Sequence, residues 1–94
     1  MTKSNMKSLN NKPVGEKIVK AAIKINEKIW SGYRHSNIMA DIWAENHNQE
    51  IETSQQGFLT DTGRFVDRTE AADIAFKAGQ IGSGINSLDS YMLF

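Results

Sequence analysis

Two arginines stand where helices are expected to begin, which is an unusual place for a positive charge. Arg34 comes shortly before Ser36, a good helix-capping residue, and Arg68 opens a second predicted helix. The N-terminal end of a helix carries a partial positive charge, so it repels cations and attracts anions. Both arginines therefore indicate a nearby anionic group. A phosphate suits them because a guanidinium binds it through two parallel hydrogen bonds.

Two further residues are candidates for the same phosphate site. Arg64, on a predicted hairpin, would provide a second forked donor, and His35 could donate to a phosphate or exchange a proton. A simpler interpretation pairs Arg68 with a carboxylate at the start of its own helix and points Arg34 into water. The spacing alone favours this simpler interpretation, since surface ion pairs are common.

Aromatic residues lie close in sequence to these arginines, as a surface that stacks a nucleotide base beside phosphate donors would require. At strand spacing, aromatic residues more often belong to the core. A place in the core is the favoured interpretation for Phe65. For Trp30 and Tyr33, the core and the base-stacking surface are about equally favoured. The aromatic residues in question are Trp30, Tyr33, Phe58 and Phe65.

The sequence lacks the motifs of the common enzyme classes. It contains no Walker loop, GxSxG, HExxH or GxGxxG motif, and no nucleophile with an orienting base is recognisable. There is no Cys, and two separated His residues do not suggest a zinc site, so no metal or cofactor is expected. A binding protein is therefore favoured over an enzyme.

A predicted β-hairpin carries Arg64, Phe58 and Phe65. Gly57–Leu59 and Arg64–Val66 are predicted strands, joined by the polar turn Thr60–Gly63. Asp61 can bond its own downstream backbone in this turn, and Gly63 can take a positive φ at no steric cost.

A capped helix follows this hairpin directly. Asp67 and Glu70 have the spacing of a capping box, so the helix should start near Arg68, and Gly79 should end it. Its apolar stripe is mostly alanine, which lets the helix lie close to whatever it covers. The stripe consists of Ala71, Ile74, Ala75 and Ala78.

A first hairpin is expected nearer the N-terminus. Glu16–Ile25 alternates apolar and polar residues as a half-buried strand does, although the same residues would also serve as an amphipathic helix. The β-branched residues favour the strand. Asn26–Lys28 would then turn the chain into a second strand, Ile29–Tyr33, in which Gly32 marks a bulge or a close approach.

A helix is predicted between the two hairpins, from its N-cap Ser36 to about His47. At the other end of the chain, Ser87–Phe94 is expected to form a short turn whose aromatic end docks on the body or on a neighbouring subunit. The predicted buried side of the helix carries Ile38, Met39, Ile42 and Trp43.

The length and composition indicate one small domain, residues 16–94, behind a flexible arm, residues 1–15. No apolar run approaches the ~20 residues that a bilayer span needs, and no secretory signal is recognisable, so we expect a cytoplasmic protein with no membrane contact. Lys plus Arg and Asp plus Glu number eleven each, which argues against binding DNA or RNA through bulk positive charge.

The run QGFLTDTGRFVDRTEAADIAFKAGQI, with IWSGYRHSNI before it and LDSYMLF after it, resembles the phage Thoeris anti-defence family, type 1. These proteins are sponges that sequester cyclic ADP-ribose signals made by TIR-domain proteins of the bacterial host. The resemblance covers about residues 18–94. Ser36 stands where relatives often have a second His, and the C-terminal end departs from their SEDL-type sequence.

The resemblance implies an α+β protomer with a hairpin, a helix, a second hairpin and a second helix. It also implies that protomers form dimers and then hexamers, with signal pockets at subunit contacts and cyclic oligonucleotides at other sites in some members. It implies a phage protein that acts in the host cytoplasm and holds the signal without cleaving it. An inhibitor that binds a host defence complex, as anti-CRISPR proteins do, is the alternative. Arg34 and Arg64 are expected to hold the diphosphate, and an aromatic residue the adenine. The expected ligand-binding residues are Trp30, Arg34, His35, Phe58, Arg64, Phe65 and Arg68.

Overall fold

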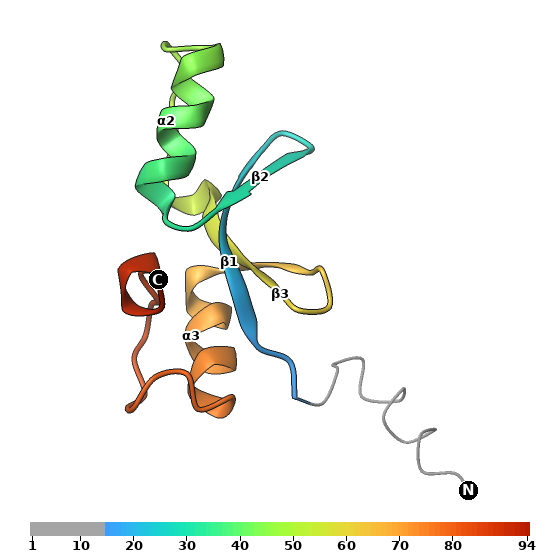
Figure 1. Ribbon diagram of the computed structural model, residues 1–94, viewed down its shortest axis with the longest axis vertical. Helices are drawn as coiled ribbons and strands as arrows, with labels where there is room; N and C mark the ends of the chain where they lie inside the picture. The colour runs from blue at the N-terminus through green and yellow to red at the C-terminus, as the bar shows by residue number, and fades with distance from the viewer. Residues whose placement is uncertain (1–14) are drawn as a thin grey trace, which may run out of the picture.

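The computed structural model describes residues 15–94 and packs two helices against a four-stranded antiparallel sheet (Figure 1). The predicted α+β class and its order of hairpin, helix, hairpin, helix and final turn are confirmed. The predicted arm, residues 1–15, lies almost wholly outside the described residues. The strands are β1 (Ile18–Ile25), β2 (Lys28–Gly32), β3 (Gln56–Thr60) and β4 (Phe65–Asp67); the helices are α2 (His35–Glu45) and α3 (Arg68–Lys77); 3-10 turns occupy Thr53–Gln55 and Ser90–Met92.

Strand β1 is the centre of the sheet, whose order is β2-β1-β3-β4. The strand interpretation of this segment is therefore confirmed over the helical one. Ala21 pairs with Gly32 of β2 on one side and with Phe58 of β3 on the other. The hairpin turn before β2 is tight because Asn26 takes the left-handed conformation, with φ of 56°. Both predicted hairpins thus belong to one sheet.

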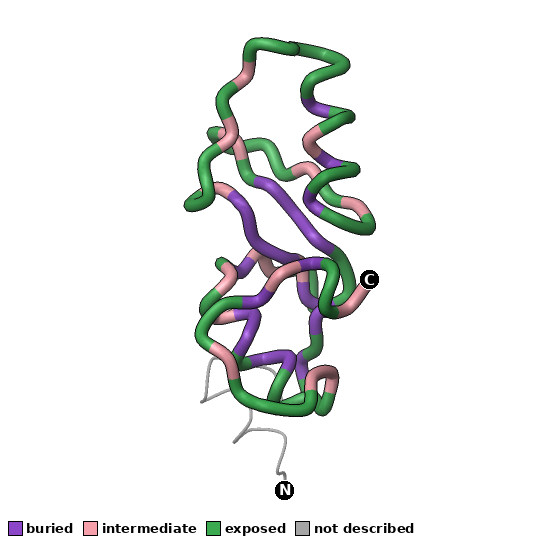
Figure 2. The backbone as a smooth tube through the Cα atoms, turned by 90° about the vertical axis from the view of Figure 1, so that its left-hand side faces the viewer, coloured by how far each residue is buried: buried purple, intermediate pink, exposed green. Residues whose placement is uncertain are grey.

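The core lies between one face of this sheet and the two helices, and buried residues occur on both the strands and the helices (Figure 2). Ala21, Ile23, Phe58 and Val66 are paired across three strands, so their side chains share that face. The helix α3 contributes mostly alanines and therefore lies close to the sheet, as predicted. The core residues of α3 are Ala71, Ala72, Ile74 and Ala75, whereas Ala78 is exposed.

The predicted limits of α3 are confirmed. The Asp67 carboxylate accepts a hydrogen bond of 2.8 Å from the main-chain N–H of Glu70. The reciprocal half of the capping box does not form, because the Glu70 carboxylate binds Arg64 instead. At the other end Gly79 has φ of +75°, and the N–H of Gln80 donates to the carbonyl of Ala75, which closes the last turn.

Helix α2 differs from its prediction at both ends. Its N-cap is Arg34, not Ser36, and its last residue is Glu45, so His47 lies beyond it. The helix starts earlier because the side chain of His35 is itself buried, and the buried stripe then continues three and seven residues later at Ile38 and Ile42. Met39 is only half-buried. Trp43 is 42% exposed, which corrects its predicted burial, since a helix turns by about 100° between consecutive residues.

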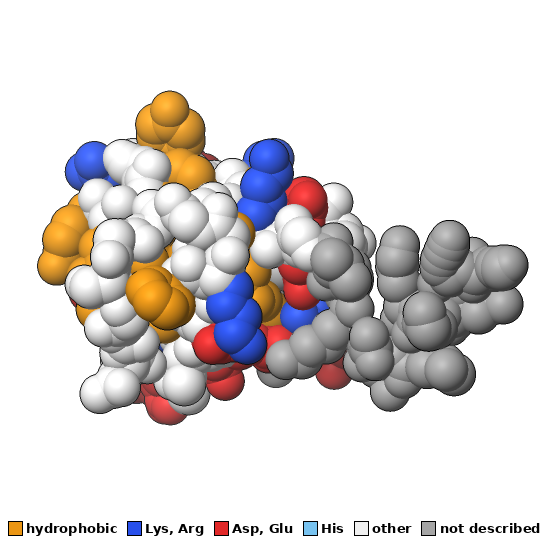
Figure 3. Space-filling model, turned by 90° about the horizontal axis from the view of Figure 1, so that it is seen from below, with side chains coloured by type: hydrophobic (Ala, Val, Ile, Leu, Met, Phe, Trp, Pro, Cys, Tyr) orange, Lys and Arg blue, Asp and Glu red, His pale blue; other side chains and the backbone are white. Residues whose placement is uncertain are grey.

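None of the helices described within residues 15–94 is long and apolar enough to cross a bilayer. Charged side chains of both signs share the surface: Figure 3 shows Lys and Arg next to Asp and Glu on the underside of the molecule. The described surface seen from this side therefore has no large area of a single charge sign, which fits the equal numbers of acidic and basic residues.

Gly57→Ala should destabilise the fold strongly, because the centre of the sheet leaves no room for a side chain at this position. A Cβ there would collide with the main-chain oxygen of Val66 and lie 2.7 Å from Cζ of Phe65. We expect a loss of at least about 2 kcal/mol in the free energy of unfolding, measured by urea denaturation. Gly82→Ala is the matched control, since nothing lies within 4 Å of its added carbon. Equal stability of the two variants would contradict this packing.

Candidate functional site

A hollow of about 380 Å³ lies where the first residues of α2 and of α3 meet the C-terminal end of the chain. We call it the two-helix hollow. It brings together three of the seven predicted site residues, Arg34, His35 and Arg68. Two helix N-termini and two guanidinium groups border it, and both kinds of group attract negative charge. Its remaining lining residues are Ser36, Met39, Gln56, Asp89, Ser90 and Tyr91.

Arg34 binds the last described residue of the chain. Its Nε and Nη2 donate to the main-chain oxygen of Phe94 over 3.1 and 2.7 Å. The Phe94 ring stacks on Tyr33, with ring centroids 5.8 Å apart. The interpretation that Arg34 points only into water is therefore wrong, although its surroundings are exposed. Two nitrogens of the guanidinium thus donate to one oxygen, whereas a phosphate would offer a separate oxygen to each of them.

Arg68 is paired across the hollow rather than within its own helix. Its Nη1 forms an ion pair with the Asp89 carboxylate, and its Nη2 donates to the Gln56 side-chain oxygen over 2.6 Å. The predicted pairing with Asp67 or Glu70 is not found; Asp67 caps the helix and Glu70 binds elsewhere. The Nε of Arg68 is buried and has no hydrogen-bond partner among residues 15–94.

His35 is a buried part of the lining, 5% exposed, and is held at three points. Its main-chain N–H donates to the Ser90 hydroxyl over 3.1 Å, its Nε2 lies 2.7 Å from the Gly57 carbonyl oxygen, and its ring edge meets the Phe58 ring. Burial lowers the pKa of the imidazole, which favours the neutral form. The carbonyl can only accept, so Nε2 carries the proton and Nδ1 is an acceptor. This Nδ1 is buried without a partner in the described chain.

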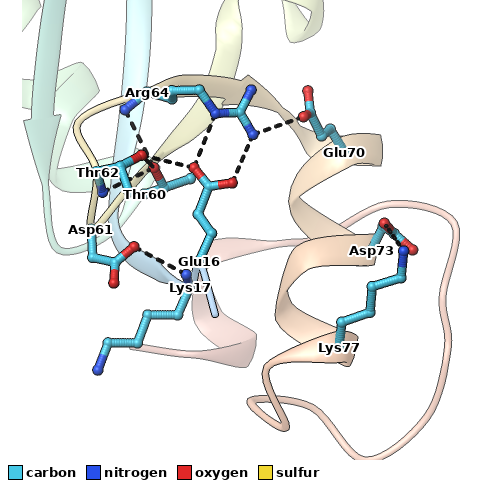
Figure 4. A network of polar contacts seen from close by, with 9 residues as sticks. All are labelled: Glu16, Lys17, Thr60, Asp61, Thr62, Arg64, Glu70, Asp73 and Lys77. Atoms are coloured by element: carbon cyan, nitrogen blue, oxygen red, sulfur yellow. Dashed lines mark hydrogen bonds and ion pairs between the residues drawn. The ribbon is translucent and has the colours of Figure 1, made fainter. Parts of the chain in front are cut away.

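Arg64 does not line the two-helix hollow. Its Nε and Nη2 donate to the Glu16 carboxylate over 3.0 and 2.8 Å, and Nη2 also donates to Glu70 over 3.0 Å (Figure 4). The same Glu16 accepts from the Thr62 hydroxyl, which ties the β3–β4 turn to the residues before β1. The Arg64 guanidinium holds the pKa of the Glu16 carboxyl at about 2. Both carboxylates that bind Arg64 belong to the same chain, so this arginine stabilises the fold.

The structure also separates the predicted aromatic residues from the hollow. Phe58 is fully buried and belongs to the core. Trp30 lies on β2, with Nζ of Lys28 4.1 Å from its ring centroid, and lines a different hollow of about 520 Å³ at the C-terminal end of α2. Phe65, on β4, is half-buried with Nζ of Lys24 6.0 Å from its ring centroid. None of the three lines the two-helix hollow.

The aromatic residue that lines the hollow, Tyr91, is one that the sequence did not assign to a site, and it is 65% exposed. Tyr33, which the sequence left open between core and binding surface, is 71% exposed beside Arg34 but does not line the hollow. Gln56, Asp89 and Ser90 were also not foreseen as site residues. One pattern in the sequence could have indicated them. The polar pair Asp89-Ser90 stands between the apolar Leu88 and the aromatic C-terminal residues.

A family model for the phage T4 y16D protein matches residues 17–94. The chain belongs to this phage protein family. The match includes both helices and the C-terminal end, so every residue that lines the two-helix hollow lies within it. No curated protein and no solved structure matches the chain. Within residues 15–94, no group of three or more His, Asp and Glu side chains is arranged to hold a metal ion.

Glu16→Gln should reduce stability in a way that depends on pH. The pKa of this carboxyl falls from 4.5 to about 2 on folding, so the unfolded chain binds the proton more tightly. The resulting stabilisation is complete above pH 4.5 and is lost as the pH falls toward 2. We expect a deficit of roughly 2 kcal/mol at neutral pH, after allowing for the partial exposure of Arg64.

Urea unfolding near pH 7 and near pH 3 checks this expectation, with the exposed Glu50→Gln as control. The deficit of Glu16→Gln should be clearly smaller at the lower pH. An equal deficit at both pH values would mean that the ion pair with Arg64 does not stabilise the fold through the charge of Glu16.

Proposed function

We propose that this phage-family protein binds and sequesters a cyclic nucleotide immune signal in the host cytoplasm, without cleaving it. A cyclic ADP-ribose isomer is the first candidate ligand, and cyclic oligonucleotides are further candidates. In this role the protein blocks immunity of the Thoeris type. The proposal combines the resemblance of the GFLT…GRFVDR and RHSNI elements to Thoeris anti-defence proteins with the geometry of the two-helix hollow.

The observation that carries the proposal is the convergence of Arg34 and Arg68 on one hollow at two helix N-termini. A diphosphate carries two negative charges and several acceptor oxygens, which suit two guanidinium groups and the first amides of two helices. The exposed ring of Tyr33, next to Arg34 in the chain, offers a face for stacking a base. Tyr33 thus takes the role that the sequence gave to Phe58, Phe65 or Trp30.

Sequestration needs tight binding and no reaction. Nanomolar affinity corresponds to about 12 kcal/mol, which a small open hollow does not supply unless more of the ligand is covered. At about 380 Å³ the two-helix hollow is near the lower limit for sites that enclose a small molecule. We propose that a second copy of the chain covers the exposed side of the ligand, in a dimer that assembles further into a hexamer.

The exposed aromatic side chains at the C-terminal end also suit the alternative function, in which the protein inhibits a host defence complex by binding it. Tyr33 and Tyr91 are both more than half exposed on the same side as Arg34. Aromatic residues beside an arginine are typical of the centre of a protein interface. Nucleotide binding and protein binding would thus use neighbouring surfaces.

Arg34→Ala should weaken binding of cyclic ADP-ribose by about 10- to 100-fold, since a charge-assisted hydrogen bond contributes roughly 1.5–3 kcal/mol. Arg68→Gln should have a similar effect. Arg34→Lys should recover only part of the affinity, because an ammonium group cannot form two parallel hydrogen bonds with a phosphate as a guanidinium does. Isothermal titration calorimetry of each purified variant, with a panel of cyclic ADP-ribose isomers, measures the change.

Lys77→Ala is the matched control for these titrations. It also removes one positive charge from α3, but from its exposed far end, where Lys77 pairs only with Asp73 among the described residues. Its affinity should stay within about twofold of the native value, because an exposed pair contributes little. Native affinity in both Arg34→Ala and Arg68→Gln would remove the two-helix hollow from the proposal.

The bound signal should be recovered unchanged. After hours of incubation, heating the complex should release the same cyclic nucleotide that was added, in a yield equal to the amount bound. Chromatography with mass detection of the released nucleotide tests this expectation. Release of a linear product that requires the protein would identify an enzyme and contradict sequestration.

A further inference from the structure

The C-terminal segment, residues 89–94, already binds the donors of the two-helix hollow. The Asp89 carboxylate pairs with Arg68, and the Phe94 main-chain oxygen accepts two hydrogen bonds from Arg34. Between them, the Ser90 hydroxyl accepts the main-chain N–H of His35 at the start of α2. An oxygen of this segment therefore lies at each arginine and at one helix N-terminus. In Figure 1 the segment lies between the two helices.

We infer that the C-terminal segment is a built-in competitor of the ligand, and that a ligand carrying two phosphate groups binds the two-helix hollow by displacing it. The inference rests on the proposed function, because it concerns the same arginines. The hollow then has two states. In the closed state, oxygens of the C-terminal segment bind Arg34 and Arg68; in the open state, the segment has left and the diphosphate binds these arginines.

Charge explains why the segment competes with a diphosphate instead of helping to hold it. Asp89 brings a negative charge into the lining of the hollow, where it repels a phosphate on the same guanidinium. Arg68 gives one N–H of Nη1 to Asp89 and one N–H of Nη2 to Gln56, and its buried Nε has no partner in the described chain. A phosphate that binds the N–H groups now given to Asp89 and Gln56 must displace those side chains.

The segment can leave without unfolding the protein, because its anchor lies just before it. Leu88 is fully buried in the core, and its N–H donates to the carbonyl of Arg68 over 3.0 Å. Beyond Leu88 the chain forms only one short 3-10 turn, in which Tyr91 and Met92 are exposed. Its apolar contacts come from Leu93 and Phe94, which are only half-buried against the core, so its opening free energy is expected to be below that of global unfolding.

One buried atom of Arg68 indicates how a phosphate is held. Its Nε is a donor without a partner within residues 15–94. Buried polar atoms without partners are rare in folded proteins. Once the segment has moved, a phosphate oxygen can accept a hydrogen bond from this Nε.

Asp89→Asn tests the inference with inorganic pyrophosphate as the probe. The amide keeps the size of the side chain and one acceptor oxygen for Arg68, but it removes the competing charge. We expect the variant to bind pyrophosphate about tenfold more tightly than the native protein does, measured by calorimetry at fixed low salt. Asp73→Asn is the control, because it removes a charge from the exposed face of α3 and should leave the affinity unchanged.

Hydrogen exchange measures displacement of the segment directly. The amides of Met92, Leu93 and Phe94 donate within the short turn, so pyrophosphate should speed their exchange while it slows that of His35 and Arg68. Weaker or equal binding by Asp89→Asn, slower exchange in the segment, or no pyrophosphate binding by this variant would each overturn the inference.

The same measurements separate this inference from the proposed function. Displacement by pyrophosphate without binding of any cyclic nucleotide would leave the competing segment correct and the proposed ligand wrong. Tight binding of a cyclic nucleotide with unchanged exchange at residues 92–94 would support sequestration and overturn the competition.

Discussion

The pairing of β1 with strands of both hairpins is the constraint on which the rest of the structure depends. Ala21, Ala22 and Ile23 at its centre are fully buried, and each pairs with a residue of β2 and one of β3. This pairing puts the ends of β2 and β4 on the same sheet, and α2 and α3 each start close to one of those ends. The two helix N-termini can therefore border one hollow although they are more than thirty residues apart in the chain.

Local chemistry explains why much of the fold could be predicted. The cap at Asp67, the positive φ at Gly63 and the helix stop at Gly79 each depend on residues within a few positions, and all three are found. The pairing of β1 with β3 could not be read from the sequence, because it joins segments about forty residues apart and no local pattern encodes it. The start of α2 was misplaced for a similar reason: burial of His35 against Phe58 is a tertiary contact.

The candidate site was predictable only in part. Arginines at two helix N-termini correctly indicated that acceptor groups lie nearby, but the groups found there belong to the C-terminal segment, through Asp89 and Phe94. Arg64 looked equally suited to a phosphate, yet Glu16 binds it across 48 positions of sequence. Aromatic residues were harder still to place, because the same Phe pattern serves a core or a binding surface and only burial separates the two. In this protein Phe58 is in the core and Tyr91 borders the hollow.

Amide chemical shifts measured during a titration would show whether a cyclic nucleotide binds where the two helices begin. Adding a cyclic ADP-ribose isomer to the isotope-labelled full chain should shift the signals of residues 34–36, 67–69 and 89–94 together, with one saturation point. Signals around Trp30 should stay in place, apart from any changes that assembly produces. Saturable shifts confined to the hollow at Trp30, with the starts of α2 and α3 unchanged, would show that the nucleotide does not bind in the two-helix hollow.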